Sequence, residues 1–298
     1  MDFALSEEQQ ALFDMVRDFG AERIAPHAAD WEREGTIPRE LLTEAGALGL
    51  GAIYVSEESG GAGLSRLDAA LVFEALSMAC PSVASFISIH NMCAGMVDRY
   101  GARELKAKWM PSLVTMETVA SYCLTEPGSG SDAAALRTRA VRTNEGWELT
   151  GTKAFISGGG YSDVYLVMSR TGEDGPKGIS CLLVEDGAPG LSFGAPERKM
   201  GWKAQPTAQV QMDACKVAAG NLVGEEGEGF RIAMQGLDGG RLNIAASALG
   251  GAQACLDKAL TYSGERKAFG RTLDQFQALQ FKLADMEIAL QAARVFLR

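Results

Sequence analysis

The sequence predicts an α+β protein with an N-terminal helical domain, a central antiparallel β-barrel domain and an incomplete C-terminal helical bundle. Three observations lead to this expectation. Apolar residues recur at helical spacing in the first part, and the middle part carries short β-prone segments separated by turn residues. Two long helical patterns follow. We expect the three domains to cover 1–117, 118–223 and 224–298.

Composition and charge exclude several classes of protein. With 298 residues, 47% of them hydrophobic, the chain can bury a substantial core. A net charge of −10 argues against non-specific attraction to nucleic acid or to an anionic membrane. No apolar run is long enough to span a bilayer, and Met1–Gln10 lacks the basic and apolar regions of a secretion signal. No nucleic-acid or membrane partner is therefore expected.

Cysteine and histidine usage favours a reducing compartment and argues against metal chemistry. The six cysteines are scattered without a Cys-x-x-Cys pair, which favours reduced and mostly buried thiols. We expect a cytoplasmic protein if the source is bacterial, or a mitochondrial matrix protein in its mature form. His90 lies in an apolar run and is interpreted as a core or interface residue. With only two histidines, no metal site is expected.

The first part has the periodicity of a series of helices. The segment 6–9 (Ser-Glu-Glu-Gln) forms a capping box before an apolar repeat, and Pro26 interrupts that helix. Further helices are expected over 38–45, 65–76, 83–99 and 104–110. Gly60–Gly63 could be a phosphate loop, but a connector between helices is the favoured interpretation.

The middle part alternates β-prone segments with turn signals. Strands are expected over 119–124, 139–142, 147–149, 155–157, 164–169, 179–184 and 208–212. The segment 144–146 (Asn-Glu-Gly) marks a hairpin between two of them. Strands that follow one another closely, without helices between them, favour an antiparallel sheet or barrel.

The last part carries two long helices. One is expected over 230–263, although this segment contains five glycines. Each glycine weakens a helix by up to ~1 kcal/mol relative to alanine, so we expect a packing or ligand reason for them. The other covers 273–298, and we interpret its apolar stripe as core packing; the stripe is Leu279, Leu283, Met286, Leu290 and Ala293. A bundle usually needs about four helices to bury such faces. The chain is therefore expected to be C-terminally truncated.

Two glycine-rich turns lie in the middle part. Tyr122–Asp132 (Tyr-Cys-Leu-Thr-Glu-Pro-Gly-Ser-Gly-Ser-Asp) follows an apolar strand, and Thr152–Gly160 (Thr-Lys-Ala-Phe-Ile-Ser-Gly-Gly-Gly) repeats the arrangement of strand, hydroxyl and glycines. Such turns can present backbone N–H groups and hydroxyls to an anion. A polar hairpin loop is the alternative for either turn alone, but two of them could bind both ends of one large ligand.

The pattern Gly128-x-Gly130-x-x-Ala133 after a strand also resembles a nicotinamide-dinucleotide fingerprint. That fingerprint requires a helix and then a parallel strand within about thirty residues. Here 139–155 is expected to form a hairpin instead, and Pro127 fits a loop better than a strand–helix turn. The nicotinamide interpretation is therefore disfavoured.

Three segments resemble the signatures of the acyl-CoA dehydrogenase family. They are Tyr122–Asp132, then Lys153-Ala-Phe-Ile-Ser-Gly, then Arg266-Lys-Ala-Phe-Gly. The resemblance covers the whole chain, and members acting on short branched acyl groups are also similar over 87–93, 177–181, 189–194 and 237–245. The fold of that family is a helical domain, a β-barrel and a four-helix bundle, which agrees with the periodicities.

The resemblance implies FAD as the cofactor. By matching positions, Tyr122, Leu124 and Thr125 would lie along the flavin ring, with the backbone of Gly130 and Ser131 near the pyrophosphate or the substrate.

The second turn and the last part would complete the cofactor site. Phe155 and Ile156 would pack on the ring, and the Ser157 hydroxyl would lie near its redox-active nitrogen. Four further residues match positions that contact FAD from a neighbouring subunit: Arg266, Phe269, Phe276 and Gln277. Arg266 suits that role because a guanidinium can fork onto phosphate.

The implied substrate is an acyl-CoA that is short and branched at Cα, as in valine degradation and fatty acid metabolism. Asp238, Gly239, Gly240 and Arg241 match the substrate-facing turn of the first bundle helix, and Ser131 also matches a substrate position. Gly239 and Gly240 would let a CoA thioester approach the backbone.

The implied reaction is α,β-dehydrogenation, with hydride leaving Cβ for the flavin and a proton leaving Cα for a carboxylate base. Some relatives carry this base where Gly240 stands, so we expect a Glu beyond Arg298 to supply it and the 298-residue chain to be nearly inactive. Asp238 is the nearest acidic residue. However, a side chain two positions earlier on a helix points about 200° away from the position of Gly240. No catalytic residue is assigned within this chain.

Two alternatives remain open. The same fold could let oxygen reoxidise the flavin, as in acyl-CoA oxidases, or the chain could be a remnant that binds flavin or acyl-CoA without turnover. The resemblance implies electron-transfer flavoprotein as the electron acceptor and a homotetramer as the assembly.

Overall fold

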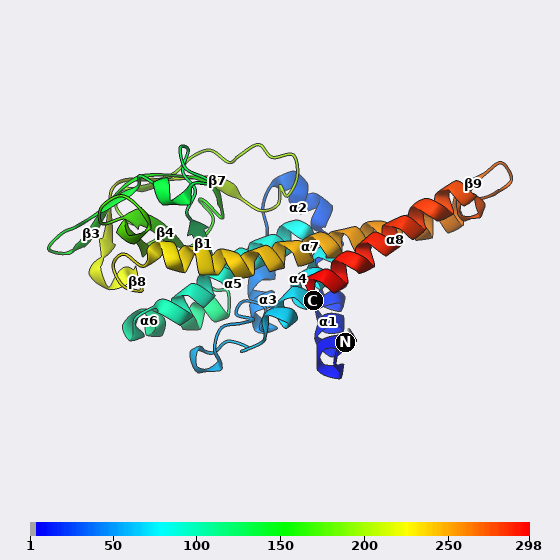
Figure 1. The fold of residues 1–298 in the computed structure, drawn as a ribbon, viewed down its shortest axis with the longest axis horizontal. Helices are drawn as coiled ribbons and strands as arrows, with labels where there is room; N and C mark the ends of the chain where they lie inside the picture. Colours follow the sequence, from blue (N-terminus) through cyan, green and yellow to red (C-terminus); the bar gives the residue numbers. More distant parts are fainter. Residues whose placement is uncertain (1–3) are drawn as a thin grey trace. The chain divides into compact units, whose positions relative to one another are not determined.

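The structure is a computed structural model that describes residues 4–298, and it is a mixed α+β fold with helices before and after a central sheet (Figure 1). The first helices are α1 (Glu7–Phe19), α2 (Ala28–Glu34), α3 (Arg39–Ala47), α4 (Arg66–Ala79), α5 (Pro81–Tyr100) and α6 (Arg103–Val114). The strands are β1 (Ala120–Cys123), β2 (Arg139–Arg142), β3 (Gly146–Ser157), β4 (Val164–Arg170), β5 (Ile179–Glu185), β6 (Leu191–Phe193), β7 (Thr207–Ala218) and β8 (Leu222–Val223). The chain then forms α7 (Gly229–Glu265), β9 (Lys267–Ala268), β10 (Arg271–Thr272) and α8 (Gln277–Leu297).

The chain divides into two compact units. The first unit combines the described part of Met1–Ala29 with Arg66–Ser85 and Leu242–Arg298, and the second combines Asp30–Ser65 with Phe86–Arg241. Both α5 and α7 contribute to both units. The three domains predicted from the sequence are not tested by this division and stay predictions.

Local signals placed the first helices correctly. The capping box is present, because the Gln9 N–H donates to Ser6 Oγ at 3.2 Å and the Ser6 N–H donates to Gln9 Oε1 at 3.2 Å. A π-helical turn, Gly20–Ile24, continues α1, and the chain leaves it around Pro26 before α2 begins. The single helix predicted over 230–263 is confirmed as α7.

The second unit contains an open sheet, so the closed antiparallel barrel predicted from the sequence is wrong. The strand order is β6-β7-β3-β2-β4-β5-β8, with β1 paired to β4. Among the strands of residues 4–298, the terminal strand β6 pairs with β7 and the terminal strand β8 with β5. They are three and two residues long, and Val223 of β8 also forms an isolated bridge with Gly101. Two pairings are parallel, β1 with β4 and β2 with β4. Closure depends on long-range pairing of edge strands, which turn signals do not reveal.

The predicted hairpin is confirmed, and it excludes a Rossmann unit. Strands β2 and β3 pair antiparallel, from Arg142 opposite Trp147 to Arg139 opposite Thr150. The segments expected as two strands, 147–149 and 155–157, belong to the single strand β3, which pairs with β7 across two register shifts. A helix does not follow the glycine turn at the place where a dinucleotide fold needs one, apart from a three-residue 3-10 turn, Ala133–Ala135.

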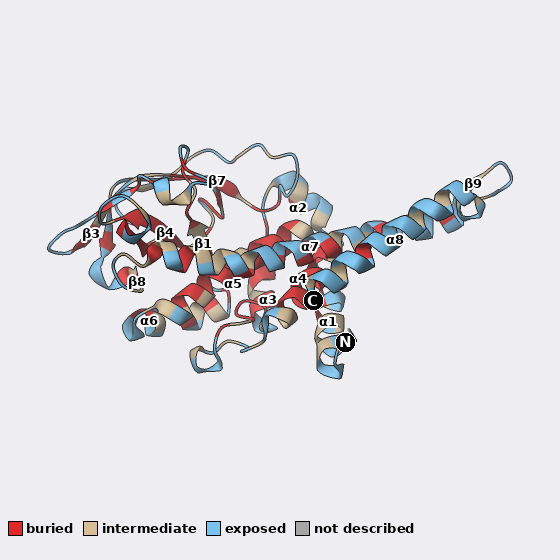
Figure 2. Ribbon diagram, in the orientation of Figure 1, coloured by how far each residue is buried: buried red, intermediate tan, exposed pale blue. Residues whose placement is uncertain are grey.

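The central strands separate two apolar clusters of the second unit. Successive residues of β4 alternate between them: Tyr165 and Val167 belong to one cluster, and Leu166 and Met168 to the other. Every residue of β4 is therefore buried, as the red strand in Figure 2 shows. Burial on both faces explains why the sequence of β4 is an unbroken run of mostly apolar residues.

In the first unit, α8 runs back alongside the C-terminal half of α7 from the β9–β10 hairpin (Figure 1). Leu249, Leu256 and Leu290 are buried between these helices. The apolar stripe of α8 was interpreted as core, but Met286 is 44% exposed and Ala293 is exposed, so only part of the stripe is buried. Helical spacing identifies the stripe but not how much of it is covered.

A buried carboxylate connects three helices of the first unit. Glu74 of α4 accepts a hydrogen bond from Arg294 Nε of α8 at 2.7 Å, and the same guanidinium donates to the Gln253 side chain of α7 at 2.8 Å. A Cβ on Gly250 of α7 would lie 1.9 Å from the carbonyl oxygen of Glu74. The glycine therefore has the packing reason that the sequence suggested.

His90 is a core residue, as predicted. Its Nε2–H donates to the carbonyl of Leu113 at 2.8 Å, and its Nδ1 accepts the N–H of Ala120 at 3.1 Å. Burial disfavours the imidazolium and lowers the pKa of His90 to about 4. The ring thus connects α5, α6 and β1 in its neutral form.

The thiols are also mostly buried, as expected. Cys255 is exposed and the other five cysteines are buried. Burial raises the pKa of Cys123 to about 12, which suppresses the reactive thiolate. Among residues 4–298, the helices lack the combination of length and apolar character needed to cross a bilayer.

His90 should make the free energy of unfolding depend on pH. Its pKa falls from about 6.5 in the unfolded chain to about 4 in the folded one, so the unfolded state binds the extra proton between these values. Stability should therefore be lost as the pH falls from 6.5 to 4, by roughly 3 kcal/mol from this group. Urea unfolding across this range should show a shallower pH dependence for His90→Asn than for wild type. His27→Asn is the control, and an equal flattening in that variant would contradict the assignment.

Candidate functional site

The structure brings the two predicted turns together. The Ala154 N–H donates to the carbonyl of Thr125 at 2.8 Å, and Ser121 Oγ donates to the carbonyl of Ser157 at 2.5 Å. These bonds place the end of β1 beside the end of β3. The residues expected along a flavin ring therefore lie on two adjacent segments: Tyr122, Leu124 and Thr125 on one, and Phe155, Ile156 and Ser157 on the other.

A buried ion pair connects the same two segments. Lys153 Nζ lies 2.8 Å from Glu126 Oε1 and donates to the carbonyl of Leu124 at 3.1 Å. The Lys153 side chain is fully buried, and that of Glu126 is 7% exposed. The Glu126 carboxylate also accepts the N–H groups of Arg137 at 2.7 Å and Thr138 at 2.9 Å. The pair thus fixes both ends of the glycine loop that separates Glu126 from Arg137.

The carboxylate of this pair is charged. Burial alone would raise the pKa of Glu126, but the Lys153 ammonium and the hydrogen-bond donors outweigh burial and lower it. Both residues lie inside the motifs seen in the sequence, but neither was predicted to have a role. The sequence did contain a signal for this ion pair, because the two residues have opposite charges and lie in two turns proposed to share one ligand.

The glycine loop is hydrogen-bonded at its start, and Gly128 within that part has open space beside it. The N–H groups of Glu126 and Ser129 donate to each other's carbonyls, at 2.8 and 3.2 Å, and Ser129 Oγ donates to the Asp132 carbonyl at 2.6 Å. A Cβ on Gly128 would meet no atom within 4 Å. Within residues 4–298 the N–H groups of Gly130 and Ser131 make no hydrogen bond. Backbone N–H groups without an internal acceptor are the kind of donor that the predicted anion site would use.

Phe155 has an unusual backbone conformation. Its φ angle is +57°, in the left-handed region, and it lies where the register of β3 against β7 shifts between Lys153 and Ile156. The bulge turns the Phe155 side chain outward, leaving it 67% exposed. An exposed aromatic residue held in a strained conformation is typical of a functional position.

Two hydroxyl groups complete this site. The Tyr122 hydroxyl is buried and has no hydrogen-bond partner among the described residues, which costs free energy unless a ligand supplies one. The Ser157 hydroxyl accepts a hydrogen bond from the Gln205 side-chain amide. Gln205 was not predicted, and nothing in its sequence context indicates this contact.

The predicted substrate turn belongs to the same unit. Asp238 and Arg241 form an exposed ion pair at 3.4 Å near the end of the α7 segment in the second unit. Leu237, directly before them, packs on the apolar cluster that contains Leu124 and against which Tyr122 also packs. One apolar cluster therefore extends from the first turn to the proposed substrate turn.

Four other predicted residues lie in the first unit, around the β9–β10 hairpin: Arg266, Phe269, Phe276 and Gln277. Phe269 is 95% exposed at φ +51°, and its ring centroid lies 6.3 Å from that of Phe276. The Arg271 guanidinium lies 4.0 Å from the Phe276 centroid. These residues form an exposed aromatic and basic group of their own.

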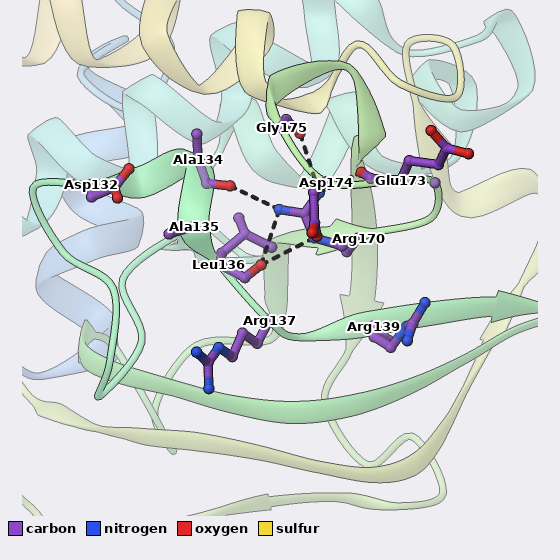
Figure 3. Close-up of a pocket in the computed structure, with 11 residues that line it drawn as sticks. Asp132, Ala134, Ala135, Leu136, Arg137, Arg139, Arg170, Glu173, Asp174 and Gly175 are labelled. Atoms are coloured by element: carbon purple, nitrogen blue, oxygen red, sulfur yellow. Dashed lines mark hydrogen bonds and ion pairs between the residues drawn. The ribbon is translucent and has the colours of Figure 1, made fainter.

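An open cavity of about 1160 Å³ lies next to the glycine loop (Figure 3). Arg170 of β4 shapes its wall, because its guanidinium donates to the carbonyls of Ala134 at 2.8 Å and Glu173 at 2.6 Å, and also to those of Leu136 and Gly175. Arg137 and Arg139 also line the cavity and are exposed, as are Asp132 and Asp174. The cavity was not predicted from the sequence.

Comparison with known proteins identifies the family. Three family models match in succession: acyl-CoA dehydrogenase N-terminal domain over residues 6–117, middle domain over 121–215 and C-terminal domain over 227–298. The chain belongs to the acyl-CoA dehydrogenase family. Acyl-CoA dehydrogenases are oxidoreductases that act on CH–CH bonds.

Individual relatives agree with this assignment. The chain is 55% identical to mitochondrial isobutyryl-CoA dehydrogenase of Dictyostelium discoideum, over 99% of this chain and 71% of the relative. The structure of butyryl-CoA dehydrogenase from Megasphaera elsdenii superposes with a TM-score of 0.95 at 38% identity, covering all of this chain and 79% of that one. A structure of PigA with FAD and proline has a TM-score of 0.94 at 29% identity, with the same coverage.

The Glu126–Lys153 pair should be important for stability. Lys153→Met would leave a buried carboxylate without its ammonium, and we expect a loss of roughly 3–5 kcal/mol in the free energy of unfolding. The double variant Glu126→Gln/Lys153→Met should recover part of this loss because no charge remains buried. Urea unfolding measures both. Lys216→Met, which breaks the exposed pair with Glu148 in the same sheet, is the control; a loss for Lys153→Met no larger than for Lys216→Met would contradict this role.

Proposed function

We propose that this chain binds FAD and takes part in the α,β-dehydrogenation of a short acyl-CoA branched at Cα, with isobutyryl-CoA as the first candidate. The observation that carries this proposal is the paired arrangement of the two turns. An outward-turned Phe155 lies on the segment adjacent to an open glycine loop, and the Glu126–Lys153 pair fixes both segments.

The residues present fit a flavin dinucleotide. Phe155 offers an exposed aromatic face, the buried Tyr122 hydroxyl lacks a partner among the described residues, and the N–H groups of Gly130 and Ser131 are available for a pyrophosphate. Further residues proposed for cofactor binding are Leu124, Thr125, Ile156 and Ser157, with Arg266, Phe269, Phe276 and Gln277 acting on FAD of a neighbouring subunit. When bound, FAD supplies a hydride acceptor for an unactivated Cα–Cβ bond.

For the acyl-CoA we propose a path along the same unit. Ser131 and the turn Asp238–Arg241 would contact the substrate, and the cavity beside Asp132 would receive the nucleotide end of CoA. Arg137 and Arg139 support this because they place two exposed guanidinium groups at the cavity, where they could pair with phosphates. Electron-transfer flavoprotein remains the proposed acceptor and a homotetramer the proposed assembly.

The proposed base is a Glu outside residues 1–298. Gly240, at the matching position of α7, has no side chain to accept a proton. Asp238 is 68% exposed and paired with Arg241, whereas a base for a Cα proton works best as a desolvated carboxylate with a raised pKa. Acyl-CoA oxidase chemistry and ligand binding without turnover are the competing proposals; peroxide production would favour the first.

FAD binding is directly testable. Added FAD should be retained on gel filtration with a flavin absorption spectrum, and Phe155→Ala should weaken its affinity about 2- to 12-fold through lost ring stacking. Titration of flavin fluorescence gives the Kd. Val141→Ala, an exposed apolar residue on β2, is the control. Retention of a nicotinamide dinucleotide instead, or an unchanged Kd for Phe155→Ala, would overturn the proposal.

Turnover tests the proposed position of the base. With FAD and isobutyryl-CoA, enoyl-CoA formation by this chain should be at least ~10²–10⁴ slower than for a family member that contains the base. Asp238→Asn should not slow it further. The product can be followed by liquid chromatography. Rapid turnover that Asp238→Asn abolishes would show that Asp238 is the base.

A further inference from the structure

The segment that leads into β7 brings the Gln205 side chain to the end of β3. Gln205 is 4% exposed, and its side-chain amide N–H donates to the Ser157 hydroxyl. Ser157 is the last residue of β3 and pairs with Thr207, the first residue of β7. Beside this pair, the Gly158 N–H donates to the carbonyl of Pro206 at 2.7 Å. The backbones that carry the amide and the hydroxyl are therefore held against each other.

Two charged side chains hold the segment that contains Gln205. The Lys199 ammonium donates to the carbonyl of Gln205 and to the Thr207 hydroxyl, the latter at 2.9 Å. The Glu32 carboxylate of α2 accepts the N–H of Ala204, directly before Gln205, at 3.2 Å. The protein alone thus positions the Gln205 amide, which lowers the ordering cost of any ligand contact that depends on it.

The direction of the Gln205–Ser157 hydrogen bond decides what the hydroxyl can offer a ligand. An amide NH₂ group can only donate, so the Ser157 oxygen is the acceptor. A hydroxyl has one proton of its own, which is then available for a different acceptor. In the part of the chain that the structure describes, Ser157 Oγ makes no other hydrogen bond. Ser157 is half-buried and follows the exposed Phe155 by two residues, so its proton is available to a ligand that covers Phe155.

We infer that Gln205 is a positioning residue for the flavin, because it holds the Ser157 hydroxyl as a hydrogen-bond donor to the redox-active ring nitrogen. The inference rests on the proposed function. In the oxidised ring this nitrogen is an acceptor, and a hydroxyl with a fixed role meets it without a further loss of rotational freedom. The amide N–H also polarises the hydroxyl that accepts from it, which strengthens the bond that the hydroxyl donates.

A purely structural role for Gln205 makes a different prediction. If the buried amide only supports the segment before β7, its removal should change the affinity for every flavin alike. If it acts through the Ser157 proton, the loss should be confined to a flavin whose ring nitrogen can accept that proton. The analogue 5-deaza-FAD has a C–H group in place of this nitrogen and cannot accept a hydrogen bond there. The ratio of the two affinities therefore separates the roles without any need for turnover.

The experiment is calorimetric titration of the chain with FAD and with 5-deaza-FAD. Wild type should bind FAD more tightly by about 2- to 12-fold, the value of one hydrogen bond. Gln205→Met, which keeps an unbranched side chain but has no donor, should lose most of this preference, with the Kd for 5-deaza-FAD unchanged. Ser157→Ala should abolish the preference, and adding Gln205→Met to Ser157→Ala should change the affinity ratio no further.

A second substitution keeps the test available if Gln205→Met does not fold. Gln205→Glu is nearly isosteric, but an ionised carboxylate can only accept, so it would take the Ser157 proton away from the ligand. This variant should also lose the preference for FAD, whereas its added charge should affect both flavins.

Asn221→Leu is the matched control. Asn221 is 6% exposed in the same unit, and its amide donates to the carbonyl of Leu183 at 2.9 Å. This variant should lower stability and leave the affinity ratio unchanged. An equal affinity of wild type for both flavins, a wild-type ratio in both Gln205 variants, or the same loss in Asn221→Leu would overturn the inference and leave the proposed function intact. Failure of wild type to bind either flavin would instead sink the proposed function, and this inference with it.

Discussion

The buried contact between Glu126 and Lys153 is the constraint on which the rest of the site depends. Charged groups are tolerated in an interior only when their hydrogen-bonding capacity is met. Here the carboxylate accepts two backbone N–H groups as well as the ammonium, and the ammonium also donates to the Leu124 carbonyl. The contact thereby positions the end of β1, both ends of the glycine loop and the strand just before Phe155.

Features that depend on neighbouring residues were predictable from the sequence. The capping box at Ser6, the β2–β3 hairpin and the long α7 were all expected, and so was the buried state of His90. Features that depend on distant pairing were not. The sheet is open rather than closed, β1 runs parallel to β4, and Lys153 finds its partner 27 residues away. The candidate site residues were predicted from motifs, but the cavity beside Asp132 and the contact of Gln205 with Ser157 are visible only in the folded chain.

The glycines of α7 show how tertiary packing overrides helix propensity. Each glycine lowers the stability of an isolated helix. In the structure, Gly250 admits the backbone of Glu74, and Gly236 admits the side chain of Met96. These are close approaches that alanine would prevent, so the local loss is offset by contacts to another helix. A glycine within a long apolar helical pattern is therefore a sign of close packing as much as of flexibility.

The left-handed backbone at Phe155 has a consequence for how this sequence can change. A non-glycine residue in that region costs about 1–3 kcal/mol, and a side chain that is 67% exposed returns little of this through burial. Glycine would relieve the strain at once. Mutational drift under pressure for folding alone would therefore remove the aromatic ring, so its persistence would require selection for a ligand that covers it.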